Sequence, residues 1–252
     1  MNRLPEKGRI PVVTVMLVLL NLAAFILISG SESPEALMRK YGFGPEDFVK
    51  GRNLLTVITS AFVHVDWTHL FGNLVYLIIF GLLLEHRVGY LKFLLIYFTS
   101  HFFALMVGVV FSFRSTMVGA SAAISGVMGA CFAGYPEEKS SLGLLAFATL
   151  PLISSFVPIV VTTSLLLFVV APLFFFASMV LVPIWPFILI FLLYQTKFAV
   201  EFANVPVAGE IKYWAHIIGF IAGEFLIIAL KGRKKKTEKG ENSRTRREIF
   251  GL

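Results

Sequence analysis

Five apolar stretches, each long enough to cross a bilayer as a helix, constrain this chain more than any other feature. They cover residues 10–29, 67–84, 90–113, 117–134 and 213–230. A transmembrane helix needs about twenty predominantly apolar residues. Only 15% of the residues are charged and 57% are hydrophobic, whereas soluble domains carry about 25% charged residues. We therefore predict an all-α, polytopic membrane helix bundle and exclude a soluble domain, a disordered chain, a coiled coil and a disulfide scaffold.

The distribution of basic residues predicts the orientation in the membrane. The net charge is +7, and residues 231–252 hold nine basic and three acidic side chains. With the N-terminus inside, the inner segments hold fifteen Lys and Arg residues and the outer segments seven. Because cytoplasmic loops are enriched in Lys and Arg, we expect a plasma-membrane protein with both termini in the cytoplasm. Residues 231–252 are interpreted as a disordered tail that contacts anionic lipid, and no nucleic-acid partner is expected.

The region 142–199 is mostly apolar but is interrupted by prolines. These are Pro151, Pro158, Pro172, Pro183 and Pro186. Two cytoplasmic termini require an even number of crossings, so this region contributes either one crossing or three, and both remain open. We expect one transmembrane domain over residues 1–230, with room for an inserted hairpin at about 137–171. Residues 30–60 are expected to form an ordered interfacial loop.

Polar side chains inside apolar helices are the informative ones in a membrane protein, because they are costly there unless they have a role. His69 and Asn73 are four residues apart, so they share one face at the start of the second helix. Ser121 opens the fourth helix and His216 opens the last. All three helices start at the outer surface in the predicted topology. The four side chains are therefore expected to converge near the outer leaflet.

Small residues indicate which helices pack together. They recur at spacing four in the fourth stretch, at Ser121, Ser125 and Gly129 and at Ala122, Gly126 and Ala130. The last stretch repeats the spacing at Ala215, Gly219 and Gly223. Such faces let two helix backbones approach closely. If these two faces meet, Ser121 and His216 lie at the same depth.

This set of side chains suits acyl transfer. A serine hydroxyl becomes a nucleophile when a neutral imidazole about 3 Å away accepts its proton. Amide, imidazole and backbone N–H groups can stabilise the oxyanion that forms. No acid stands beside His216 in the sequence, and Glu224 lies two helical turns away. The pattern therefore favours a Ser–His dyad over a three-residue triad.

Three motifs, taken in order, resemble those of rhomboid intramembrane serine proteases, and we expect a prokaryotic, archaeal-type member. They are an H-x4-H-x3-N pattern formed by His64, His69 and Asn73, a G-x-S motif at residues 119–121, and an A-H-x-x-G-x-x-x-G pattern at residues 215–223. The resemblance implies a six-helix core, with an extra hairpin between the fourth and last core helices. It also implies cleavage of transmembrane-helix proteins without a cofactor or a metal.

The resemblance assigns roles position by position. Ser121 would be the nucleophile and His216 the general base and acid, while Asn73 and His69 would line the oxyanion hole. Glu85 matches a structural acid, and His64 matches a motif position of structural or uncertain role. The helices at the site would pack through Gly119, Ala122, Ser125, Gly126, Gly219 and Gly223.

The sequence also departs from that family. Most relatives have glycine where Ala122 stands, and some bacterial ones place an aromatic side chain, which stacks on the base, where Ser125 stands. About thirty-five extra residues separate Tyr135 from Pro183. The single Cys131 lies in an apolar run and is interpreted as inert packing.

Three other functions compete with the protease. A rhomboid-fold protein without activity would act as a membrane-protein binder or chaperone, although such proteins usually lack the serine or the histidine. A transporter would suit the Pro-broken region, but the sequence shows no inverted repeat. A zinc site is disfavoured because a spacing of five places His64 and His69 on different helical faces and no H-E-x-x-H pattern is present.

Overall fold

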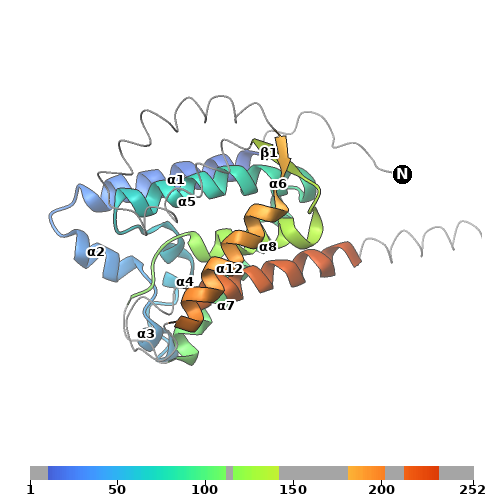
Figure 1. The fold of residues 1–252 in the computed structure, drawn as a ribbon. Helices are drawn as coiled ribbons and strands as arrows, with labels where there is room; N and C mark the ends of the chain where they lie inside the picture. Colours follow the sequence, from blue (N-terminus) through green and yellow to red (C-terminus); the bar gives the residue numbers. More distant parts are fainter. Residues whose placement is uncertain (1–10, 112–115, 142–180, 202–212, 233–252) are drawn as a thin grey trace, which may run out of the picture.

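The computed structural model describes residues 11–111, 116–141, 181–201 and 213–232. In this part of the chain, apolar helices form a bundle (Figure 1). Four are long and apolar enough to cross a membrane: Val12–Ser29, Trp67–Val88, Tyr90–Val110 and Tyr213–Gly232. Two shorter apolar helices complete the set, α8 (Ser121–Gly134) and α12 (Trp185–Glu201). The predicted all-α, polytopic membrane bundle is confirmed.

The second crossing consists of three consecutive elements. It begins as α5 (Trp67–Tyr76), continues through a π-helical turn, η2 (Leu77–Gly81), and ends as α6 (Leu82–Val88). Asp66 occupies the N-cap position of α5, and its Oδ1 accepts a hydrogen bond of 2.7 Å from the backbone N–H of His69. The helix continues four residues beyond the predicted end at residue 84.

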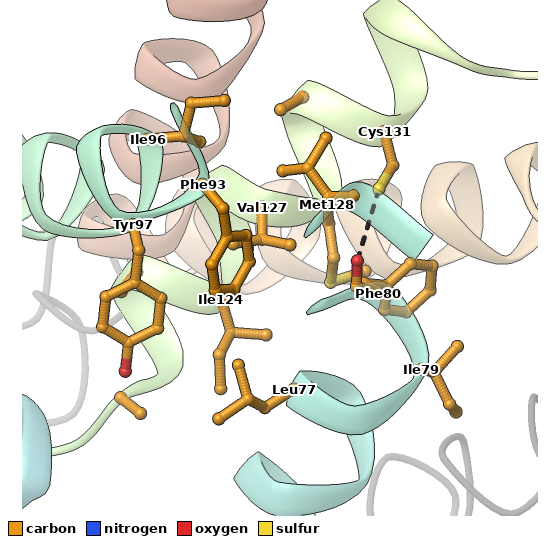
Figure 2. Packing of buried hydrophobic residues seen from close by; sticks show 14 of the residues in the cluster. Leu77, Ile79, Phe80, Phe93, Ile96, Tyr97, Ile124, Val127, Met128 and Cys131 are labelled. Atoms are coloured by element: carbon orange, nitrogen blue, oxygen red, sulfur yellow. Dashed lines mark hydrogen bonds between the residues drawn. The ribbon is translucent and has the colours of Figure 1, made fainter. Parts of the chain in front are cut away.

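Helix α8 forms the centre of the bundle. All ten of its residues from Ala122 to Cys131 are buried, as expected for a helix that is apolar on every face. Figure 2 shows Ile124 and Met128 of α8 against side chains of η2 and of α7 (Tyr90–Val110). The Cys131 thiol donates to the Phe80 carbonyl at 3.7 Å, so the lone cysteine is a buried packing group.

Small residues bring α8 against the C-terminal helix, Tyr213–Gly232. A Cβ added at Gly219 would overlap the carbonyl oxygen of Ala122, and one added at Gly223 would overlap that of Gly126. Side chains larger than hydrogen therefore cannot occupy these two positions at the present helix separation. The two small-residue faces meet as the sequence predicts.

The segment between α1 (Val12–Ser29) and α5 is ordered, as predicted for residues 30–60. It contains the short helices α2 (Pro34–Tyr41), α3 (Pro45–Val49) and α4 (Thr56–Thr59) and the 3-10 turn η1 (Ser60–Phe62). Phe43 and Met117 exchange two backbone hydrogen bonds of 2.9 and 2.8 Å, and the Gly119 N–H donates to the Ser60 carbonyl at 2.9 Å. This segment therefore pairs with Met117 as a short extended bridge and holds Gly119 through its N–H.

The fourth apolar stretch is consequently not helical throughout, because its first four residues lie outside the helix that starts at Ser121. The fourteen residues of α8 span roughly 21 Å at about 1.5 Å per residue. The hydrocarbon core is about 30 Å thick. If the far end of α8 reaches one edge of that core, Ser121 lies about 9 Å inside the other edge.

A two-stranded antiparallel sheet joins the ends of the region 142–180. Strand β1 (Lys139–Ser141) pairs with β2 (Leu181–Pro183), with Ser140 opposite Val182. The sheet lies beside α6 (Figure 1), where Glu138 forms an ion pair with Arg87. Ser141 and Leu181, which flank residues 142–180, are therefore paired with each other. The hairpin predicted at about 137–171 lies largely outside the described residues, and so does the tail from residue 233 onward. The number of crossings in the region 142–199 depends on residues that also lie outside them.

Glu85 connects the first two crossings at the same end of the bundle. One carboxyl oxygen accepts a hydrogen bond from the Val13 N–H at 3.0 Å, and the other accepts from the Thr14 N–H and hydroxyl, both at 2.7 Å. The first N–H groups of a helix have no partner within the helix. Glu85 therefore caps α1, in keeping with the structural role that the family resemblance implies.

We expect Gly223→Ala to destabilise the protein by about 1–3 kcal/mol, because the added methyl group would separate two tightly packed helices. Gly232→Ala is the matched control, since it lies on the same helix with no atom near its Cβ position. Thermal unfolding in detergent measures both variants. Equal unfolding temperatures would show that the close approach at Gly223 does not stabilise the bundle.

We expect Glu85→Gln to destabilise the protein by roughly 1–3 kcal/mol, because the amide NH₂ would face N–H donors and leave a buried group unsatisfied. Glu35→Gln, at an exposed position of α2, removes the same formal charge and serves as the control. The free energy of unfolding in detergent measures the difference. A loss no larger than that of the control would contradict the capping role.

Candidate active site

Ser121 and His216 lie in direct contact although they are 95 positions apart in the sequence. The His216 Nε2 is 2.8 Å from the Ser121 Oγ. Ser121 is the first residue of α8, and Ala120 occupies the N-cap position. The serine hydroxyl is thus directed to the imidazole and does not cap the helix.

Helix α12 contacts His216 from the other side. Gln195 Oε1 is 3.0 Å from the His216 Nδ1, and the centroid of the Phe191 ring is 6.3 Å from that of the imidazole. Neither residue was among the predicted site residues. Gln195 could have been found from the sequence, because a polar amide within an apolar helix usually has a role. Nothing in the sequence distinguishes Phe191 from the other phenylalanines.

The Asn73 side chain is held by a second histidine. Asn73 Nδ2 is 2.8 Å from His64 Nε2. Burial lowers the pKa of His64 to about 3, so the imidazole is neutral at physiological pH and its Nε2 can accept from the amide. Because an amide nitrogen carries two N–H groups, this bond fixes the amide and leaves a second donor. The structure therefore gives His64 a positioning contact at the site.

Gly119 lets the chain before Ser121 pass close to His69. Its φ is +110°, a conformation that L side chains rarely adopt. A Cβ at this position would lie 2.7 Å from the His69 Nε2 and 3.7 Å from the Asn73 Nδ2. The glycine of the G-x-S motif thus allows the backbone before Ser121 to lie against both predicted oxyanion-hole residues.

These side chains line one cavity of about 580 Å³. Ser121, His216, Asn73 and His69 all contribute to its wall, together with Gln195 and several apolar side chains of α8 and α12. The volume lies in the range of about 300–1,000 Å³ typical of ligand pockets. The cavity can therefore admit a short unfolded segment of a chain to the Ser121 hydroxyl.

The two substituted motif positions are accommodated. Ala122 is buried: its backbone carbonyl lies against Gly219, and its side chain belongs to a buried apolar cluster with Ala104 and Ala215. The Ser125 hydroxyl donates to the Ser121 carbonyl at 2.9 Å, and the aromatic ring near the base is Phe191. Neither substitution separates Ser121 from His216.

His64 and His69 do not lie on different faces of one helix, so the prediction from their spacing is wrong. Their ring centroids are 4.9 Å apart, because His64 precedes α5 and the loop folds back toward the helix. Within the described residues, no group of three or more His, Cys, Asp or Glu side chains is arranged to hold a metal ion. His101 lies apart from the cavity, where its Nε2 is 3.0 Å from the Ser60 Oγ.

Residues 51–172 match the family model of the rhomboid domain. This range contains His64, His69, Asn73 and Ser121 but ends before His216. The family match therefore includes the serine but not the histidine. The contact between His216 and Ser121 is a separate observation, made from the structure alone.

Two relatives show the same similarity. The chain is 38% identical over 82 residues to the Arabidopsis thaliana RHOMBOID-like protein 6, mitochondrial; the match covers 32% of this chain and 27% of that protein. It is 29% identical over 117 residues to the Toxoplasma gondii Rhomboid-like protease 3, covering 46% of this chain and 44% of the relative. The chain thus spans less than half the length of either relative. Both come from eukaryotes and give no support to an archaeal-type origin.

Proposed function

We propose that the protein is a rhomboid-type intramembrane serine endopeptidase that cleaves transmembrane segments of other membrane proteins. The observation that carries this proposal is the 2.8 Å contact between Ser121 Oγ and His216 Nε2 on the wall of an open cavity. The rhomboid-domain match and the protease-named relative support it. A membrane-protein binder without activity would have no need of this contact.

The proposed reaction begins with the Ser121 hydroxyl. Its oxygen attacks the scissile carbonyl while His216 Nε2 accepts its proton. His216 then donates that proton to the leaving amine. Water attacks the resulting acyl-enzyme, with His216 again acting as base, and releases the second fragment.

The developing oxyanion forms at the N-terminus of α8. The first backbone N–H groups of a helix lack intrahelical partners, and the helix dipole places partial positive charge there. Asn73, oriented by His64, and His69 supply further donors on the same cavity wall. Preorganised donors of this kind stabilise the tetrahedral intermediate more than the substrate carbonyl.

The substrate is proposed to be a transmembrane helix that unwinds locally. A carbonyl inside a helix is already hydrogen-bonded and shielded by neighbouring side chains. Helix-breaking or small residues near the cleavage point lower the cost of exposing it. Because α8 is shorter than the hydrocarbon core is thick, Ser121 is proposed to lie below the membrane edge. The unwound segment must then descend into the cavity, and water must follow the same route.

The orientation follows from the charges of the sequence. We propose that both termini are cytoplasmic and that the site opens toward the outer leaflet of the plasma membrane, with residues 231–252 on anionic lipid. The Arabidopsis relative is named as mitochondrial, so cell fractionation is the direct test of the membrane involved. Labelling of both termini from each side of sealed vesicles tests the orientation.

We expect purified protein in detergent to react with a fluorophosphonate probe, and Ser121→Ala and His216→Ala to abolish the reaction without lowering the unfolding temperature. The serine provides the reacting oxygen and the imidazole removes its proton. Ser29→Ala and His86→Ala, both at exposed positions, should react as the wild type does. Reaction that persists in Ser121→Ala would show that the nucleophile is another residue, and a folded wild type that does not react would favour the inactive binder.

We expect Asn73→Ala to slow the same labelling reaction by ~10²–10³, the usual effect of removing one oxyanion donor. The Ser121 oxygen attacks the phosphorus of the probe through a five-coordinate transition state and fluoride leaves. Negative charge develops on the phosphoryl oxygen in that transition state, so the rate constant reports on the oxyanion hole. The dependence of the rate on probe concentration separates binding from reaction. An unchanged maximal rate would exclude Asn73 from the oxyanion hole.

A further inference from the structure

A buried amide lies behind the base of the proposed protease. Gln195 is 3% exposed and sits on α12, whose sequence is otherwise mainly apolar. A buried amide in such a helix is costly unless it is hydrogen-bonded. Its Oε1 lies 3.0 Å from the His216 Nδ1.

The chemistry of this contact determines the tautomer of His216. An amide oxygen can only accept a hydrogen bond, so the Nδ1 that faces it carries the proton. In a neutral imidazole the other nitrogen, Nε2, then has the free lone pair. That nitrogen is the one 2.8 Å from the Ser121 Oγ. The bond to Gln195 therefore selects the tautomer that can accept the serine proton.

We propose that Gln195 is a positioning residue that holds His216 in the reactive tautomer and orientation, so that Ser121, His216 and Gln195 act in series. The proposal rests on the proposed protease function and deepens it. The Nδ1–H bond strengthens when His216 becomes an imidazolium, because a charged donor forms a stronger hydrogen bond than a neutral one. Gln195 thus stabilises the transition state more than the resting enzyme.

An amide suits this position better than a carboxylate does. The site lies among apolar helices, where an ionised side chain is costly to bury. A neutral amide provides the acceptor without that cost. Phe191 stands one helical turn before Gln195, with its ring centroid 6.3 Å from that of His216. Helix α12 therefore contacts the imidazole through both an oxygen and an aromatic ring.

The test compares Gln195→Met with Gln195→Glu in the full-length protein. Methionine keeps the length and flexibility of glutamine but removes the acceptor, whereas glutamic acid keeps an oxygen acceptor in either protonation state. Thr196→Val is the matched control, because Thr196 is the next residue on α12, is exposed, and donates its hydroxyl to the Leu192 carbonyl of its own helix. The readout is fluorophosphonate labelling of Ser121 over a range of probe concentrations, with thermal unfolding of each variant.

We expect Gln195→Met to lower the maximal labelling rate constant by about ten- to a hundredfold, as for loss of one buried hydrogen bond. The probe concentration at half-maximal rate should not change, and Gln195→Glu should restore most of the rate. Thr196→Val should label at the wild-type rate. A Met variant that labels as fast as the wild type would overturn the proposal, as would a slow Glu variant whose unfolding temperature matches that of the wild type.

A spectroscopic measurement tests the tautomer without relying on activity. The protein is labelled with ¹⁵N in its histidine rings, and ¹⁵N spectra are recorded. The signals of His216 are assigned as those that are absent from the spectrum of His216→Ala. We expect a protonated Nδ1 in the wild type and a mixture of tautomers in Gln195→Met. A wild type with its proton on Nε2 would overturn the role of Gln195. A wild type that shows the expected tautomer but never labels at Ser121 would instead remove the protease function, so the two failures are distinguishable.

Discussion

The close approach of α8 and the C-terminal helix is the constraint on which the site depends. Gly219 and Gly223 lie against the backbone oxygens of Ala122 and Gly126, with no room for a side chain. Apolar side chains do not drive helices together in lipid, so packing of this kind provides much of the association. The same contact sets the relative height of the two helices and brings Ser121 to His216.

Three polar contacts inside the bundle join side chains to partners in other segments of the chain. Glu85 of the second crossing caps α1, His64 holds Asn73, and Gln195 contacts His216. Each pair removes the cost of an unsatisfied group in a nonaqueous setting and also fixes a side chain in one orientation. Structural stability and preorganisation of the proposed catalytic groups therefore arise from the same bonds.

The cavity is lined at the point where the fourth apolar stretch changes from nonhelical chain, at Val118, to helix, at Ser121. The interfacial segment binds residues 117–119 through Phe43 and Ser60, and Gly119 adopts a positive φ beside His69. Helix α8 therefore begins only at Ser121, four residues after the start of the apolar stretch. Ser121, the first residue of that helix, lines the cavity, and the first N–H groups of a helix have no intrahelical partner.

The sequence by itself determined the class of fold and the approximate positions of the long apolar helices, and it predicted that Ser121, His216, His69 and Asn73 converge. Long apolar runs, four-residue spacing and rare polar groups are local patterns with direct physical meaning in a membrane. The sequence did not determine the start of α8 at Ser121, the proximity of His64 to His69, or the partners of His216. Those depend on contacts between distant segments: a loop that pairs with residues 117–119, a turn that folds His64 back, and a helix, α12, that follows a long apolar region. Only the tertiary structure could decide them, because the same residues on an isolated helix or strand have no such neighbours.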